Sequence, residues 1–239
     1  LAKFHMKSFG TTQAELAAVA AKNHAHSAHN PLSQYREAMT VDEVMAARKV
    51  SWPLTLPMCS PISDGAAAAI LCREEELDRF DRSRAVKIHA TALRTGSDRD
   101  PQEFDRHITH LAARDAYARA GLGPEDMHVA EVHDATAFAE IQQVENLGFC
   151  DFGEGGALTE SGATSIGGRI PVNLSGGLES KGHPVGATGL AQVFELTTQL
   201  RGEAGARQVA NAKFAIAENG GGFHGIEEAV ACVTILGRT

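Results

Sequence analysis

One histidine lies in a glycine-rich stretch of the chain. Residues 175–189 read SGGLESKGHPVGATG, so five glycines and one proline surround His183. Glycine can adopt positive φ and lets a backbone come close to a ligand. An apolar, helix-like stretch follows at residues 190–200, and the start of a helix favours an anionic oxygen. We therefore expect His183 to donate a hydrogen bond to a carbonyl oxygen that becomes an oxyanion. An incidental histidine on a surface loop is the weaker alternative.

A second histidine, His133, lies between a predicted strand at residues 129–132 and a predicted helix at residues 136–147. Side chains at the ends of strands often carry the chemistry of α/β folds. The alternative is a histidine that only caps the following helix.

Two polar residues, Glu218 and Asn219, precede a run of three glycines at residues 220–222. A glutamate at this position could transfer a proton if burial raised its pKa. An asparagine could only orient a group or form a hydrogen bond. A carboxylate that caps a turn is an equally good interpretation of Glu218.

Strand-like and helix-like segments alternate along the chain, which predicts a layered α/β fold. The predicted helices cover residues 11–30, 40–48, 101–120, 136–147 and 190–200, and the predicted strands cover residues 65–72, 86–93, 129–132, 212–217 and 229–236. A charged segment at residues 74–84 indicates a boundary between two parts of the fold. We therefore divide the chain into residues 1–84 and residues 85–239.

Composition narrows the classes of function. The 239 residues carry a formal net charge of −8 and are 43% hydrophobic, which allows a large core and argues against general affinity for nucleic acids. The sequence contains no run of 18 apolar residues, so we expect no membrane span. The four cysteines lack C-x-x-C spacing, so we expect no metal site, no disulfide framework, and reduced thiols in a cytoplasmic protein. The histidines at the end of the first predicted helix are expected to be solvated: His24, His26 and His29.

The motifs resemble those of a known family. GHPVGATG at residues 182–189 resembles the G-H-P-x-G-A-[ST]-G motif of thiolases, and PVNLSGGLESK at residues 171–181 resembles the version found in thiolases of the sterol-carrier-protein type. Further blocks follow the family's order: FGTT at 9–12, residues 16–30, PISDGAAA at 61–68, VHD at 132–134, GEGG at 153–156 and NGGG at 219–222. The resemblance covers residues 9–236.

The resemblance implies a thiolase-like layered fold of the αβαβα type, a mixed sheet with sandwiched helices. It implies cleavage or formation of a carbon–carbon bond on a 3-oxoacyl-CoA, with His133 and His183 stabilising the thioester oxyanion. The order of the two histidines favours a catalytic role for His133. The coenzyme A thioester would be the substrate, with no separate cofactor and no metal. The acyl-CoA tunnel would be lined by Ser175, Gly176, Gly177, Lys181 and Gly221.

This sequence departs from the family at three places. The family's usual phenylalanine after the histidine block is Thr136 here, and its late cysteine, the general acid/base, falls on Glu218 or Asn219. In the family, the nucleophilic cysteine belongs to the first half of the fold, which would precede this chain. None of the four cysteines present has the setting of that nucleophile.

The resemblance therefore implies that the chain is the second half of the fold. Residues 1–84 would form a loop region and the last strand of an incomplete first domain, and residues 85–239 a complete second domain. A sheet edge exposed in this way predicts a homo-oligomer, or a complex with a chain that supplies the first half. Two alternatives stay open: a related aldolase that cleaves side chains without the nucleophilic cysteine and works with an OB-fold partner, and a non-catalytic acyl-CoA-binding subunit.

Overall fold

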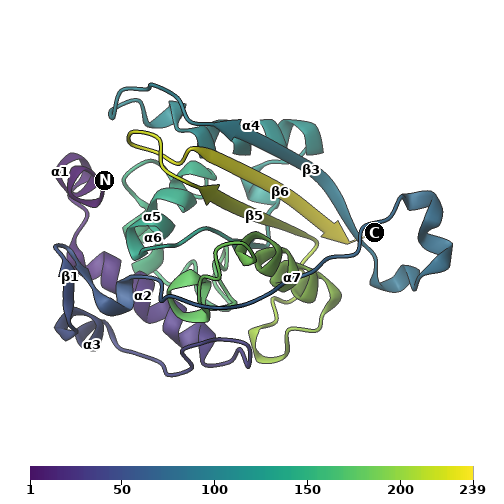
Figure 1. Ribbon diagram of the computed structural model, residues 1–239, viewed down its shortest axis with the longest axis horizontal. Coiled ribbons are helices and arrows are strands. Elements are labelled where there is room, and N and C mark those ends of the chain that lie inside the picture. Colours follow the sequence, from purple (N-terminus) through teal and green to yellow (C-terminus); the bar gives the residue numbers. More distant parts are fainter. Residues whose placement is uncertain (239) are drawn as a thin grey trace.

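A four-stranded mixed sheet forms the centre of the computed structural model, which describes residues 1–238 (Figure 1). Its strand order is β3-β6-β5-β4. The strands are β3 (Val86–Thr95), β4 (Val129–Glu131), β5 (Phe214–Gly221) and β6 (Val230–Arg238). β6 pairs antiparallel with both β3 and β5, and β4 pairs parallel with β5. The predicted α/β class with a mixed sheet is confirmed.

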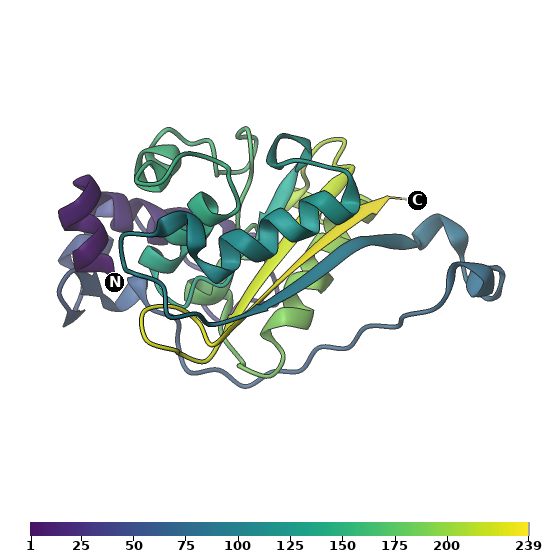
Figure 2. The same ribbon diagram turned by 90° about the horizontal axis from the view of Figure 1, so that it is seen from above.

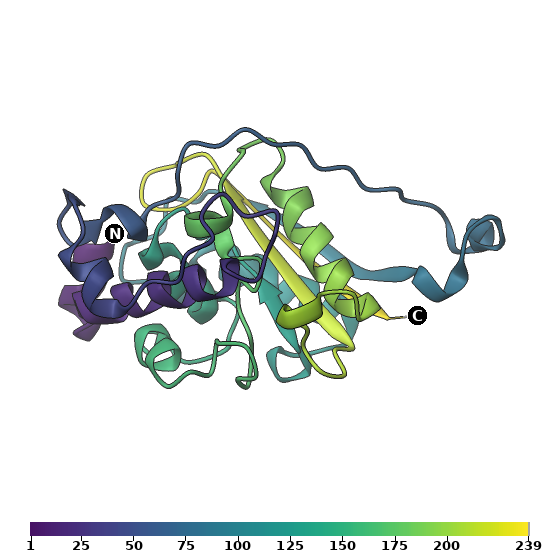
Figure 3. The ribbon, with the colours of Figure 1, turned by 90° about the horizontal axis from the view of Figure 1, so that it is seen from below.

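Helices cover both faces of this sheet. α4 (Ile108–Ala120) and α5 (Ala137–Asn146) lie on one face, as seen from above in Figure 2, and α7 (Thr188–Arg201) lies on the other, as seen from below in Figure 3. The alternation of side chains along β5 follows these layers. Ile216 packs in the core on the α4 side, whereas Ala215 and Ala217 pack in the core under α7.

The N-terminal part packs against the side of this body. It contains α1 (Ala2–Phe9), α2 (Gln13–Ser27), α3 (Val41–Ala46), β1 (Lys49–Ser51) and β2 (Leu54–Thr55). Thr12 and Thr40 each begin a helix with a capping box, as the sequence predicts at Thr40. A third core joins α2 and α5 through residues such as Leu16, Val19 and Ile141.

The remaining elements are short. α6 is Gly155–Glu160, and η6 (Gly177–Lys181) is a single π-helical turn before His183. The 3-10 turns are η1 (Leu56–Met58), η2 (Glu74–Arg79), η3 (Arg82–Arg84), η4 (Phe104–Arg106), η5 (Pro124–Asp126) and η7 (Gly205–Arg207). Within residues 1–238, no helix has the length and apolar character needed to cross a bilayer.

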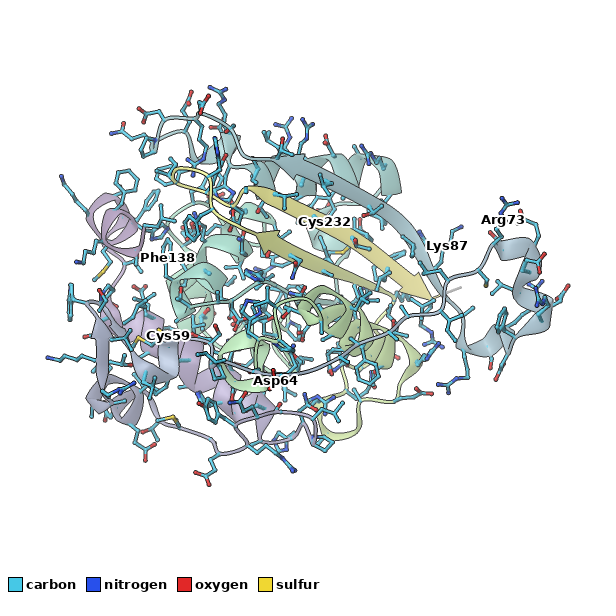
Figure 4. All side chains as sticks on the ribbon, in the orientation of Figure 1. Cys59, Asp64, Arg73, Lys87, Phe138 and Cys232 are labelled. Carbon is cyan, nitrogen blue, oxygen red and sulfur yellow. The ribbon has the colours of Figure 1, made fainter. Side chains whose placement is uncertain are left out.

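The strand predicted at residues 65–72 is wrong for this structure. The segment is extended but pairs with no strand among residues 1–238, and Ile70 is 86% exposed. Figure 4 labels Asp64 and Arg73 at its two ends, and Figures 2 and 3 show it running away from the body. A strand forms only where another backbone meets its N–H and C=O groups. The division at residue 84 stays a prediction.

The helix predicted from residue 101 begins later, at Ile108. The Asp100 carboxylate accepts the N–H of Gln102 within a local turn (2.9 Å), which does not continue as a helix. His107 is the N-cap instead, because its Nδ1 accepts the N–H of Thr109 (3.2 Å).

Two of the histidines predicted to be solvated are buried. His24 lies 3.2 Å from Ser180 Oγ through Nδ1, and His26 Nδ1 lies 3.1 Å from the carbonyl oxygen of Asn173. Burial lowers the pKa of His26 to about 3. His29 is exposed as predicted. The segment at residues 173–180 covers this end of α2, and that long-range contact has no local sequence signal.

Candidate active site

The structure brings His133 and His183 together. Their rings lie edge to face, with centroids 5.0 Å apart. His133 follows β4, and His183 precedes α7, so the edge of the sheet and the glycine-rich loop meet at this point. Burial is the main reason that both pKa values are lowered, to about 4 for His133, and Lys181 lowers that of His183 further. Both imidazoles are neutral near pH 7 and can each donate one hydrogen bond.

The His183 loop is held at its backbone and at its ring. The backbone N–H of His183 donates to Ser63 Oγ (3.1 Å), and that hydroxyl donates to Gln34 Oε1 (2.5 Å). The ring Nδ1 lies 2.7 Å from Thr188 Oγ1 at the start of α7. Because Nδ1 is used in this way, Nε2 is the ring nitrogen available to a ligand.

A cavity of about 370 Å³ adjoins this loop. It lies between residues 63–67 and residues 184–187, the residues that follow His183. Ile62 also forms a parallel bridge with His183. The loop therefore has room for a ligand beside it, and the extended segment forms the opposite wall of that space.

Asn219 and Glu218 point to opposite faces of β5. The Asn219 amide donates to Gln192 Oε1 on α7 (3.0 Å), and its Cγ lies 3.6 Å from where a Cβ on Gly189 would be. Asn219 therefore lies on the same side as the His183 loop. Glu218 shares the other face with Ile216, and its charge interacts with those of Glu228 and Asp134.

Glu218 meets the histidine pair through a backbone contact. Its Oε2 accepts the N–H of His133 (2.9 Å), and its Oε1 is buried with no hydrogen-bond partner among the described residues. Burial, and then the neighbouring Glu228, raise the pKa of Glu218 to about 8. The carboxyl group is therefore protonated near pH 7 and can act as a proton donor.

The predicted ligand-binding residues before His183 are largely occupied by the protein itself. Ser175 donates its N–H and O–H to Glu131, at 2.9 and 2.6 Å. A Cβ on Gly176 would lie 2.4 Å from the Ser27 side chain, and one on Gly177 would lie 2.2 Å from Asp134. These two glycines therefore allow contacts between segments of this chain.

The other two predicted binding residues are half-buried. Lys181 is the last residue of η6, and its charge lowers the pKa of both His133 and His183. Gly221 ends β5 next to Val230. A role for these five residues in binding coenzyme A stays a prediction.

Sequence reasoning missed a set of buried polar residues beneath the two histidines. Asp134, Glu140 and Glu179 surround the amide of Asn23 and are completely buried. The available signal was the position of Asp134, directly after His133, and of Glu179, four residues before His183. No spacing in the sequence places Asn23 between them.

Two of the cysteines, Cys59 and Cys150, are poor nucleophiles. Cys59 forms a bridge with Thr136, and burial and Glu179 raise the pKa of its thiol. Burial raises the pKa of Cys150 to about 12. A thiol reacts as its thiolate, so both remain unreactive near pH 7. All four cysteines are unpaired.

The sequence matches the family described as "Thiolase C-terminal domain-like" over residues 91–238, more than half of the chain. The acetyl-CoA acetyltransferase of Methanothermobacter thermautotrophicus is 46% identical over the whole chain, which spans 62% of that protein. Sterol carrier protein 2 of Rattus norvegicus is 44% identical over 91% of this chain and 41% of its own length. The chain thus spans about half the length of these relatives.

Solved structures agree on the fold. The Ltp2-ChsH2(DUF35) aldolase superposes with a TM-score of 0.79 at 23% identity, covering 99% of this chain and 61% of that one. A monomeric SCP2-thiolase-like protein of Mycobacterium smegmatis superposes with a TM-score of 0.70 at 17% identity, covering 98% and 49%. The family match over residues 91–238 and the relatives that are 44–46% identical show that the chain belongs to the thiolase superfamily, with relatives of the sterol-carrier-protein type.

Proposed function

We propose that the chain provides the oxyanion-stabilising half of an acyl-CoA C-acyltransferase, which cleaves or forms the carbon–carbon bond of a 3-oxoacyl-CoA. The observation that carries the proposal is the pair of neutral imidazoles at 5.0 Å beside the start of α7. Relatives named as acetyl-CoA acetyltransferase support the chemistry.

In this proposal the thioester oxygen accepts hydrogen bonds from the Nε2–H of His183 and from His133. When the bond between the α and β carbons breaks, the electron pair is delocalised onto that oxygen. In this tautomer the Thr188 hydroxyl donates to Nδ1 (2.7 Å), in place of donating to the carbonyl oxygen of Pro184 (3.2 Å), and so keeps the ring oriented. Donors that are already in place stabilise the developing charge without reorganisation.

The remaining polar groups have different tasks in the proposal. Asn219, on the side of the His183 loop, orients a substrate or water by hydrogen bonding. Glu218, protonated near pH 7, supplies a proton to the carbon or oxygen that carries the charge. The substrate is the coenzyme A thioester, and we expect neither a cofactor nor a metal.

The nucleophilic cysteine of a thiolytic reaction would come from the part of the relatives that this chain does not span. We expect that part to be supplied by a partner chain or by further residues, in a cytoplasmic assembly that is either a homo-oligomer or a complex with that partner chain. The unpaired segment at residues 65–72 and the exposed α7 side chains Leu190 and Phe194 support an interface there.

A retro-aldol reaction is the second candidate. It breaks the carbon–carbon bond of a 3-hydroxyacyl-CoA and needs an enolate-stabilising pair but no cysteine. Two observations favour it: neither Glu218 nor Asn219 is a cysteine, and the fold superposes on an aldolase that has a DUF35 component. An OB-fold partner would then take part.

Product analysis separates these functions. Thiolysis of acetoacetyl-CoA by the assembled protein would consume one coenzyme A for each acetyl-CoA pair. Retro-aldol cleavage of a 3-hydroxyacyl-CoA would release a carbonyl compound and consume none. If the assembled protein binds acyl-CoA but catalyses neither reaction, the chain is a non-catalytic binding subunit and our proposal is wrong.

A further inference from the structure

Three buried carboxyl groups meet around a single amide below the histidine pair. The Asn23 Nδ2 atom lies 3.1 Å from Asp134 Oδ2, 2.9 Å from Glu140 Oε2 and 3.1 Å from Glu179 Oε2. All four side chains are completely buried. An amide NH₂ has two protons, so it cannot donate fully to three acceptors. The cluster therefore needs another proton or another donor.

The three carboxyl groups have unequal surroundings. Glu140 forms an ion pair with Lys22 (2.6 Å) and also accepts from the Asn173 amide (2.7 Å), so it is the group best suited to carry a negative charge. Asp134 accepts the backbone N–H groups of Leu178 (2.7 Å) and Glu179 (3.3 Å).

Glu179 has the poorest set of donors. Only the Asn23 amide reaches its Oε2, and its Oε1 has no hydrogen-bond partner among the described residues. Burial raises the pKa of Asp134 and of Glu179 well above the usual range, and the charge of Asp134 adds to the effect at Glu179. Of the two, Glu179 is the better site for a retained proton, because two N–H donors already favour the charged form of Asp134.

This cluster connects the two segments that carry the histidines. Asp134 follows His133 directly, and Leu178 and Glu179 belong to η6, which leads to His183. The approach is close, because a Cβ on Gly177 would lie 2.2 Å from Asp134 Oδ2. The distance between the histidines is therefore tied to the contact between Asp134 and η6.

We propose that Asp134 is a positioning residue that holds the His183 loop against His133, and that Glu179 keeps a proton that allows this contact at neutral pH. The charged and titratable groups that face the pair are Lys22 of α2, Glu140 of α5, Glu218 of β5 and Cys59 of the segment after η1. Lys22 is the one cation among these four, and its nearest partner is Glu140. Ionisation of Glu179 would therefore add an unbalanced negative charge and loosen η6.

Two amide variants separate this proposal from simple removal of charge. Glu179→Gln resembles the protonated acid, because its amide has an acceptor oxygen and a donor NH₂ group. The contact between Asp134 and η6 should therefore persist in this variant. Asp134→Asn would place an NH₂ group towards Asn23 Nδ2 or towards the N–H groups of η6. All of these groups are donors, so the contact between residue 134 and η6 should weaken. If the variants acted only by relieving repulsion between buried carboxylates, both should strengthen the contact with η6 to the same extent.

The test is the nuclear Overhauser effect between the ring protons of His133 and His183 in the 239-residue chain. We expect it to be retained in Glu179→Gln and reduced at least twofold in Asp134→Asn. The control is Glu145→Gln, another buried carboxyl group of α5, which binds His5 and Gly155 and contacts neither histidine segment. Equal signals in the two amide variants would refute the proposal.

A titration of the unmodified chain covers the case in which Asp134→Asn does not fold. Raising the pH into the alkaline range should weaken the ring-to-ring signal in the unmodified chain but not in Glu179→Gln. The same pH response in both proteins would overturn the proposal. The importance of this contact for catalysis rests on the proposed function. Because these measurements do not use activity, the positioning role and the proposed function can fail separately.

Discussion

At the scale of single residues, the histidine pair depends on neutral imidazoles. Both rings are partly removed from water, and each lies close to the other and to the charge of Lys181. These surroundings disfavour the protonated ring, and among residues 1–238 the contact of Nδ1 with Thr188 Oγ1 fixes which nitrogen of His183 faces outward. The orientation of the rings matters here as much as their identity.

We expect His183→Ala to lower the turnover of an acyl-CoA substrate by ~10²–10³-fold in the assembled protein, because one donor to the oxyanion is lost. His133→Ala should have a smaller effect, since a water can fill the space. Binding of coenzyme A, measured by calorimetry, should change little in either variant. His29→Ala, at an exposed position, is the control. Unchanged turnover in both site variants would show that the two histidines take no part in the reaction.

Glu218 makes a prediction about stability and pH. Its pKa is raised to about 8 in the folded chain from the usual 4.5. The folded state therefore holds the proton more tightly than the unfolded state, and this contribution to stability is lost as the pH rises from about 4.5 to about 8.

In Glu218→Gln this loss cannot occur. The difference in unfolding free energy between the two proteins should therefore shift in favour of the variant as the pH rises from 5 to 8.5, by an amount on the order of a few kcal/mol. Buried histidines such as His26 act in the opposite direction, but they are common to both proteins and cancel. Parallel stability curves from urea unfolding would contradict the raised pKa.

At the scale of elements, the turn η6 leads directly into the loop that carries His183. It is one π-helical turn that begins at Gly177 and ends at Lys181, two residues before His183, and it contacts both α2 and Asp134. Gly177 has φ of +60°, so a side chain there would be strained as well as crowded.

Gly177→Ala should therefore destabilise the chain by about 1–3 kcal/mol. Gly186→Ala, in the same loop region, is a matched control, because a Cβ there meets nothing within 4 Å and its φ is not in the positive region. Thermal unfolding of the two variants checks the difference. Similar midpoints would show that η6 has more room than the structure indicates.

Local patterns predicted most elements but not their partners. The helices after Thr40 and Thr136 begin where side-chain caps indicate, and β3, β5 and β6 lie close to the predicted apolar runs. One failure is local, because Asp100 caps a short turn and not the helix, which begins at Ile108. The other failures are long-range. The apolar run at residues 65–72 has no neighbouring strand, and His24 and His26 are buried by a segment that is distant in the sequence. The proximity of His133 and His183 was expected from motif order, whereas the carboxyl groups below them follow only from the packing of α2.

At the scale of the whole molecule, apolar side chains lie unprotected on the α7 side. Phe194 is 52% exposed and Leu190 43%, and they are one turn apart on the outer face of α7. Relatives of this chain are considerably longer. An exposed apolar surface of this kind commonly marks an interface.

We expect the chain to associate with itself or with a partner at micromolar concentration, which light scattering would detect. Phe194→Glu should weaken that association by at least tenfold, because it would place a charge in an apolar contact. Leu32→Glu is the control, an exposed leucine of the N-terminal part. A monomer at all concentrations, with and without partner chains, would contradict this expectation.

The extended segment between Asp64 and Arg73 has a consequence for how the chain could be divided. Residues 1–63 are held to the body by buried contacts, such as Lys22 with Val172 and Glu140, and His26 with Asn173. The exposed linker contributes little to that attachment. A protease that cuts this linker should therefore leave two fragments bound to each other. The same two fragments, expressed separately, should reassemble, which makes this segment a natural place to split the gene for a complementation assay.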